Sequence, residues 1–307
     1  MNREEIVARI QALKKEKRAV ILAHYYTLPE IQDLADYLGD SLGLSKQAAA
    51  TDADIIVFCG VHFMAETASI IAPHKKVLSP APDAGCSLAD SATGEGLRKW
   101  KEQHPNGLVV SYVNTTAEVK AWTDYCCTSS NALNVVRSLP KDCEILFGPD
   151  RNLGAWINHM TGRNMQLWDG CCCVHDEITS GMIHQMLERY PDADVLIHPE
   201  ARCVDDVNLL SHPRVFFYST AGIMDHSVRV PKNRFVIATE EGTLHELGKR
   251  SPEKEFIPIA PGTICQEMKK ITLERLLETL ETECGEVRVP EDIRQRALVP
   301  IERMMSL

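Results

Sequence analysis

Three cysteines occupy matching positions in a threefold sequence repeat, and they are the side chains of this 307-residue chain best suited to binding a metal centre. Each copy contains a short hydroxyl motif, and the cysteine follows that motif by 45, 43 or 45 residues. Thiolates are soft ligands that select iron–sulfur clusters, zinc or copper(I). One equivalent thiol per copy predicts a shared iron–sulfur centre in which one iron lacks a protein ligand and acts as a Lewis acid. The three cysteines are Cys86, Cys172 and Cys265.

The chain has eleven cysteines, an odd number that argues against a disulfide framework where no export signal is seen. It has no Cys-x-x-Cys pair, the spacing typical of zinc fingers and thioredoxin-like redox sites. Free cysteines are most often small buried hydrophobic residues, and we assign that role to the remaining eight. Cys171 and Cys173 flank Cys172, and either could replace it as the middle ligand of the metal centre. The eight are Cys59, Cys126, Cys127, Cys143, Cys171, Cys173, Cys203 and Cys284.

Polar side chains lie at the end of the first apolar run of each copy. If these runs are parallel strands, this is the edge of the sheet at which ligands bind. These side chains predict an acid–base set in one composite pocket. His198 and Glu200, two residues apart on a strand, share a face. A lone histidine in such a place is more often structural, and His175, three residues after Cys172, fits either the surroundings of the centre or the substrate. The strand-end residues are His24, Tyr26, Tyr112, Asn114, His198 and Glu200.

The hydroxyl motif of each copy precedes a helical stretch. A helix N-terminus offers free N–H groups, which bind carboxylate or phosphate groups readily. For any one such residue, a plain helix cap is the commoner role. Three motifs around one pocket predict a substrate pair with several anionic groups. The hydroxyl residues concerned are Ser41, Ser129, Ser219 and Thr220.

Short apolar runs that alternate with helical stretches must position these side chains. The runs are continuous, which is typical of parallel strands covered on both faces. We predict an α/β protein of three pseudo-symmetric α/β/α sandwich lobes, with short parallel sheets around a central cluster site. The predicted strands are 19–23, 54–59, 76–79, 108–114, 144–147, 164–168, 195–200, 234–238 and 255–260.

Helices connect and flank these strands. An amphipathic helix is predicted over 3–16, with Ile6, Ile10 and Leu13 on one face. Crossover helices are predicted at 63–71, 153–160 and 244–250, and two closing helices at 272–283 and 292–305. The predicted division is an N-terminal helical segment 1–16, lobes at 17–104, 105–192 and 193–270, and closing helices within 271–307.

The overall composition excludes several classes of protein. A net charge of −10 argues against general binding to nucleic acid or to an anionic membrane. No apolar run approaches the ~20 residues of a membrane span, and the charged N-terminus lacks a signal-peptide core, so a cytoplasmic location is expected. The fingerprints of dinucleotide-binding folds, P-loops and serine hydrolases are missing.

Ordered motifs along essentially the whole chain resemble the quinolinate synthase family of NAD biosynthesis. They lie at residues 23–26, 39–42, 63–66, 112–114, 127–129, 168–175, 198–200, 219–220 and 238–240. The family resemblance implies a [4Fe–4S] cluster held by one cysteine from each lobe, here Cys86, Cys172 and Cys265. The position after His24 varies in the family, so Tyr26 rather than Tyr25 inherits the tyrosine's role. No Cys-x-x-Cys accompanies Cys265, unlike in some members.

The resemblance implies a condensation of iminoaspartate with dihydroxyacetone phosphate that gives quinolinate and releases phosphate and water. Glu200 is then expected to be the general base, assisted by His198 and Tyr26. Tyr112 and Asn114 would hold substrate carboxylates or hydroxyls. Ser41, Ser129 and Thr220 would bind anionic ends, including the phosphate. The expected pocket lining is His24, Tyr26, Ser41, Tyr112, Asn114, Ser129, His175, His198, Glu200, Ser219 and Thr220.

Two alternative functions would also need these three thiols as cluster ligands. One is a hydro-lyase of the aconitase kind, which applies an open iron to a hydroxy acid. The other is a non-catalytic iron–sulfur redox sensor, which would not need the acid–base set. The expected partners are the two small-molecule substrates and an aspartate-oxidising enzyme that supplies iminoaspartate, with no nucleic acid and no membrane.

Overall fold

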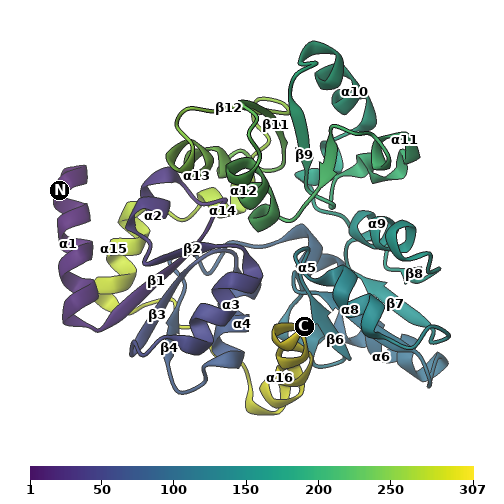
Figure 1. The fold of residues 1–307 in the computed structure, drawn as a ribbon. Helices are drawn as coiled ribbons and strands as arrows, with labels where there is room; N and C mark the ends of the chain where they lie inside the picture. The colour runs from purple at the N-terminus through teal and green to yellow at the C-terminus, as the bar shows by residue number, and fades with distance from the viewer.

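The computed structural model describes residues 1–307 and contains three four-stranded sheets, each with only parallel pairs (Figure 1). The three sheets share one strand order. In each sheet, the strand that comes second along the chain lies at one edge. The first sheet is ordered β2 (Tyr37–Gly39), β1 (Ala19–His24), β3 (Ile55–Cys59), β4 (Lys76–Leu78). The second is ordered β6 (Tyr125–Cys127), β5 (Leu108–Tyr112), β7 (Ile145–Gly148), β8 (Gln166–Leu167). The third is ordered β10 (Val215–Phe217), β9 (Asp194–Ile197), β11 (Arg234–Ala238), β12 (Glu255–Pro258).

The prediction of three α/β lobes is therefore confirmed, and each sheet with its helices is called a lobe below. The prediction of three strands per lobe was wrong, because β2, β6 and β10 were missed. Each of these has only three residues and lies at the edge of its sheet. The hydroxyl motifs follow these edge strands almost directly, so they lie at the same carboxyl edge as the other polar side chains.

Helices cover both faces of each sheet, which explains the continuous apolar strands. All residues of β3 are buried, as are nearly all of β1. The principal covering helices are α3 (Ser41–Ala50), α4 (His62–Ile71), α8 (Ala132–Ser138), α9 (Arg151–Thr161), α12 (Thr220–Arg229) and α13 (Thr243–Arg250). Shorter elements are α2 (Pro29–Leu34), α5 (Ser87–Ser91), α7 (Ala117–Lys120), η1 (His175–Glu177), η2 (Arg202–Asp205), α11 (Val207–Leu210) and α14 (Gln266–Lys269).

One helix leads into the first strand of each sheet. The first, α1 (Arg3–Glu16), was predicted, and Asn2 and Glu5 cap it reciprocally. The other two, α6 (Gly94–Gln103) and α10 (Ser180–Arg189), were not predicted. Each sheet falls inside one of the predicted lobes 17–104, 105–192 and 193–270, whose exact boundaries stay a prediction.

The two closing helices are confirmed as α15 (Leu273–Thr282) and α16 (Glu291–Ser306). α15 packs against α1, and α16 lies between the first two lobes, where it contacts α4, α7 and β6 (Figure 1). The Asn131 amide donates to the Met304 carbonyl at 2.8 Å, which ties α16 to the second lobe. No helix combines the length and apolar character that crossing a bilayer requires.

Lys120 is a fully buried cation that fixes the chain just after β5. Its ammonium donates to the Val113 carbonyl at 2.8 Å and to both oxygens of Thr115. A Lys120→Met variant loses these bonds and leaves the Thr115 carbonyl without its partner, so the free energy of unfolding is expected to fall by roughly 2–3 kcal/mol. Urea denaturation measures this change. Lys141→Met, at an exposed position, is the control and should unfold like the wild type.

Candidate active site

The carboxyl edges of the three sheets meet at one cavity, which side chains from all three lobes line. All the predicted site residues except one line it: His24, Tyr26, Ser41, Cys86, Tyr112, Asn114, Ser129, Cys172, His175, His198, Glu200, Thr220 and Cys265. The exception is Ser219, whose side chain caps α12 by accepting from the Gly222 N–H at 3.2 Å.

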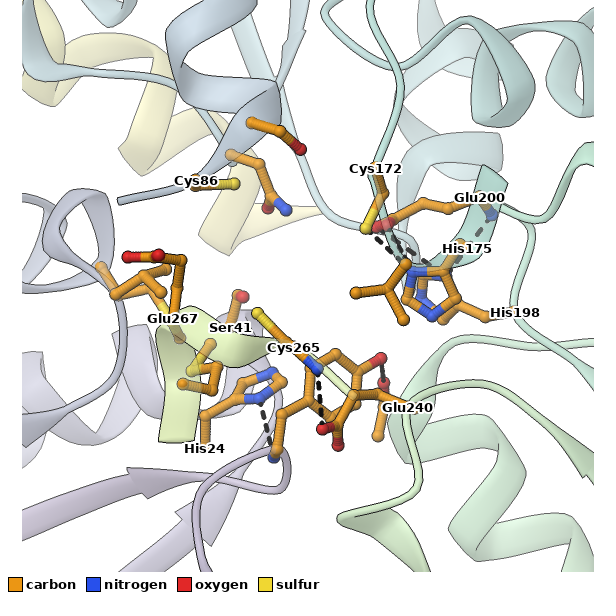
Figure 2. A pocket seen from close by; sticks show the side chains of 18 of the residues that line it. His24, Ser41, Cys86, Cys172, His175, His198, Glu200, Glu240, Cys265 and Glu267 are labelled. Atoms are coloured by element: carbon orange, nitrogen blue, oxygen red, sulfur yellow. Dashed lines mark hydrogen bonds and ion pairs between the residues drawn. The ribbon is translucent and has the colours of Figure 1, made fainter. Parts of the chain in front are cut away.

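The three predicted thiols point into this cavity from three separate loops (Figure 2). Each cysteine directly precedes, or lies close before, a short helical turn: α5, η1 or α14. For each, the N–H groups two and three residues onward lie near the sulfur and act to lower the thiol pKa. The side chains of Cys86 and Cys265 nevertheless accept no capping hydrogen bond from the helices α5 and α14 that follow them. The three lobes therefore present their thiols in the same local way.

Burial dominates the protonation of these thiols. It raises the pKa of Cys86 to about 12, and it raises the pKa values of Cys172 and Cys265 as well. None of the three is in a disulfide. A thiolate in such a place needs positive charge nearby, and a metal centre supplies that charge when it displaces the proton. The donor set therefore fits a thiolate-bound metal centre.

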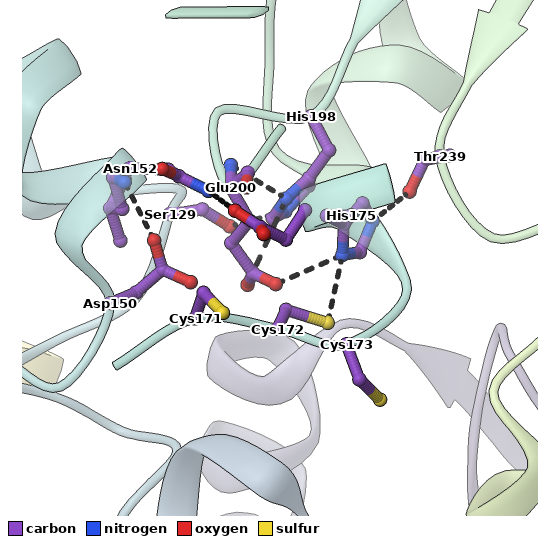
Figure 3. A network of polar contacts seen from close by, with 12 residues as sticks. Ser129, Asp150, Asn152, Cys171, Cys172, Cys173, His175, His198, Glu200 and Thr239 are labelled. Atoms are coloured by element: carbon purple, nitrogen blue, oxygen red, sulfur yellow. Dashed lines mark hydrogen bonds and ion pairs between the residues drawn. The ribbon is translucent and has the colours of Figure 1, made fainter. Parts of the chain in front are cut away.

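A compact group of possible metal ligands exists at one end of the cavity, formed by Cys172, His175 and Glu200. Their ligand atoms all lie within 4.8 Å of one another. His175 Nδ1 is 3.2 Å from Cys172 Sγ and 3.0 Å from Glu200 Oε2 (Figure 3). Cys86 and Cys265 do not belong to this group.

Glu200 is a buried carboxylate surrounded by hydrogen-bond donors. The Tyr112 hydroxyl donates to Oε1 at 2.5 Å, and His175 Nδ1 faces Oε2. Burial by itself raises the pKa of Glu200, but the hydrogen bonds that His175 and Tyr112 donate stabilise its ionised form and hold the pKa below its usual value. Glu200 is therefore ionised at neutral pH, as an acceptor of substrate protons must be.

Two further histidines of the cavity are neutral. Burial is the main cause that lowers the pKa of His24 and of His198 to about 3. His24 Nδ1 accepts from the Tyr26 N–H at 3.2 Å, so the ring proton lies on Nε2. His198 Nδ1 faces the Glu200 N–H at 3.4 Å, and its Nε2 lies 3.1 Å from the Ser129 hydroxyl. Both rings are thus oriented by the backbone of their own lobes.

The hydroxyl motifs differ in their relation to the helices. Ser41 and Thr220 are the first residues of α3 and α12. Ser129 is not at a helix start, because α8 begins three residues later, at Ala132. The prediction of a hydroxyl at a helix N-terminus was therefore wrong for the second lobe. Its neighbour Ser130 instead lies 2.6 Å from Asp40 Oδ2 and joins the lobes there.

Sequence reasoning missed Glu240, a cavity residue with no exposed surface. Its carboxylate pairs with Lys269 Nζ at 2.7 Å and accepts from the N–H groups of Cys265 and Gly242. Glu240 therefore fixes the loop that carries the third thiol. Its position after a strand could have identified it. Thr239 and Glu240 follow the end of β11, just as His198 and Glu200 follow the end of β9.

Three α/β lobes around a cavity lined by thiols and acid–base groups define a small-molecule enzyme in which a metal centre fits. The family model described as "Quinolinate synthetase A protein" matches residues 8–306. A relative named quinolinate synthase from Pyrobaculum aerophilum is 50% identical over 100% of this chain and 99% of its own. Relatives of the same name from Thermus thermophilus and Chlorobaculum parvum are 48% and 47% identical over the whole of this chain, and over 99% and 95% of theirs.

The chain belongs to the quinolinate synthetase A protein family. The resemblance predicted from its ordered motifs is confirmed, and with it the prediction that the chain is an enzyme.

Proposed function

We propose that this chain makes quinolinate for NAD biosynthesis by condensing iminoaspartate with dihydroxyacetone phosphate and releasing phosphate and water. Family membership along nearly the whole chain supports quinolinate as the product. The observation that carries the proposal is the single cavity, in which thiols and acid–base side chains from all three lobes meet.

The cofactor in this proposal is a [4Fe–4S] cluster held by Cys86, Cys172 and Cys265. Each thiol comes from a different lobe and lines the same cavity, so each would bind a separate iron of the cluster. When bound, the cluster would supply a Lewis acid at its open iron.

The acid–base chemistry is assigned to Glu200, with Tyr26 and His198 beside it. As an ionised carboxylate in a buried site, Glu200 accepts protons from substrate carbon during enolisation and dehydration. Burial raises the pKa of the Tyr26 phenol well above its usual value, so this group keeps its proton and donates hydrogen bonds. His198 is neutral, so it can take up a proton as well as donate one.

The remaining cavity residues are assigned to substrate binding. Asn114 supports this, because its buried amide oxygen has no partner within the protein. Tyr112 and Asn114 hold carboxylates or hydroxyls, and the hydroxyl residues bind anionic ends, including the phosphate. Ser219 belongs to this assignment through the N-terminus of α12 that it caps. The proposed set is His24, Ser41, Tyr112, Asn114, Ser129, His175, His198, Glu200, Ser219 and Thr220.

The proposal includes a cytoplasmic setting and a supply of iminoaspartate by an aspartate-oxidising enzyme. It keeps the lobes at 17–104, 105–192 and 193–270, with closing helices in 271–307. Both substrates are small anions, which the acidic surface does not attract, so the binding groups inside the cavity must provide the affinity.

Anaerobic turnover tests the proposal. Protein purified without oxygen is mixed with dihydroxyacetone phosphate and with iminoaspartate formed in situ from oxaloacetate and ammonia. Quinolinate, detected by chromatography and mass, is expected only when both substrates are present. Cluster-loaded protein that makes no quinolinate would contradict the proposal. Dehydration of a hydroxy acid would then favour the aconitase-like hydro-lyase, and redox-dependent absorption without turnover would favour the sensor.

A further inference from the structure

Thr239 is a buried residue of the third lobe whose hydroxyl contacts side chains from both other lobes. It directly follows β11 and is 1% exposed. Its Oγ1 lies 3.0 Å from the Tyr26 hydroxyl. It also lies 2.8 Å from His175 Nε2 (Figure 3). The function proposed above gives Thr239 no role, although it touches two residues of the acid–base site.

The His175 ring is held at both of its nitrogens. Nδ1 lies 3.0 Å from Glu200 Oε2 and 3.2 Å from Cys172 Sγ, and because a carboxylate oxygen only accepts, Nδ1 donates to Glu200. Nε2 lies 2.8 Å from the Thr239 hydroxyl, which can donate or accept. The Thr239 hydroxyl therefore has one partner in each of the other two lobes.

These bonds form one continuous chain across the three lobes. The Thr220 hydroxyl lies 3.0 Å from the Tyr26 hydroxyl and completes the chain at the start of α12. At the other end Tyr112 donates to Glu200. All members are 9% exposed or less. In sequence along the bonds, they are Thr220, Tyr26, Thr239, His175, Glu200 and Tyr112.

We infer that Thr239 is a positioning residue for the reaction, because its hydroxyl orients the Tyr26 phenol and the His175 ring toward the substrate and Glu200. This inference rests on the proposed function. Thr239 itself exchanges no proton with substrate. Its effect is to hold two groups from different lobes in one relative position, and small displacements of such groups slow catalysis strongly.

Thr239→Val keeps the shape of the side chain and removes the hydroxyl. Its kcat for quinolinate formation is expected to fall by about 10- to 100-fold, with KM values within about threefold of the wild type. Thr239→Ser restores the hydroxyl and should recover most of kcat. Thr279→Val makes the same change at an equally buried site on α15 and should behave as the wild type. Thr239→Ala serves as the second hydroxyl-free variant if the valine variant does not fold.

Two kinetic results would overturn the inference: wild-type kcat in Thr239→Val, or a Thr239→Ser variant as slow as Thr239→Val. A wild-type protein without turnover would instead overturn the proposed function. Crystal structures of cluster-loaded Thr239→Val and wild-type protein supply a readout that does not need turnover. The valine variant is expected to show the His175 ring or the Tyr26 phenol displaced, and an unchanged pair of side chains would overturn the inference.

Discussion

Replacement of Cys86, Cys172 or Cys265 by alanine is expected to remove the proposed cluster from the protein. Each thiol comes from a different lobe, and no cysteine lies next to Cys86 or Cys265 in the sequence to replace the one that is lost. Changes around a metal site that leave its ligands intact already weaken metal binding by about 10- to 100-fold, and loss of a ligand should cost more. Iron, acid-labile sulfide and visible absorption of anaerobically purified protein should therefore fall by at least about tenfold.

The chain contains matched controls for these variants. Cys203→Ala removes a fully buried thiol near η2, outside the cavity, and should keep the full iron and sulfide content. Cys173→Ala is the stricter control, because Cys173 lines the cavity one residue after the proposed ligand. If Cys173→Ala lost the cluster while Cys172→Ala kept it, the middle ligand would be reassigned. If all three ligand variants kept their iron, the cluster site itself would be wrong.

The spacing of the cysteines was readable from the sequence because the three lobes repeat with almost no insertions. Each lobe places its thiol after its last strand, and each thiol precedes a short helical turn. An apolar run of four or more residues marks most central strands, such as β3 and β11. The edge strand β2 could not be found in this way, since it has three residues and Tyr37 is exposed. Only pairing with β1, at Leu22 and Tyr37 and onward, makes it a strand.

The strand-end rule located the side chains that face the cavity, but it could not show which of them touch. Tyr26 and Thr239 are 213 residues apart, and their contact depends on how the first and third lobes pack. The same holds for Lys269, which reaches both Glu240 and the Tyr26 carbonyl. No local pattern encodes such packing. The sequence therefore predicted which residues line the site better than it predicted the hydrogen bonds and ion pairs between them.

A Glu200→Gln variant is expected to lose about 10²- to 10⁴-fold in kcat, the range typical when a general base is removed. The amide cannot take up the substrate proton. It also replaces one acceptor oxygen by an NH₂ group, although both Tyr112 and His175 donate toward this side chain. One of those donors then loses its partner in a buried site. Steady-state quinolinate formation under anaerobic conditions measures the loss.

Iron and sulfide content must be measured on the same Glu200→Gln samples, because Glu200 lies beside Cys172 and His175. Content equal to the wild type assigns the lost turnover to proton transfer rather than to a missing cluster. Glu66→Gln is the matched control outside the cavity. Its carboxylate accepts from the Ala117 N–H at 3.0 Å and lies 3.9 Å from His62 Nε2, and an amide oxygen can accept from the same N–H. Full turnover in Glu200→Gln with normal iron would remove Glu200 as the base. Tyr26 and His198, which share the cavity, would then be tested in its place through Tyr26→Phe and His198→Asn.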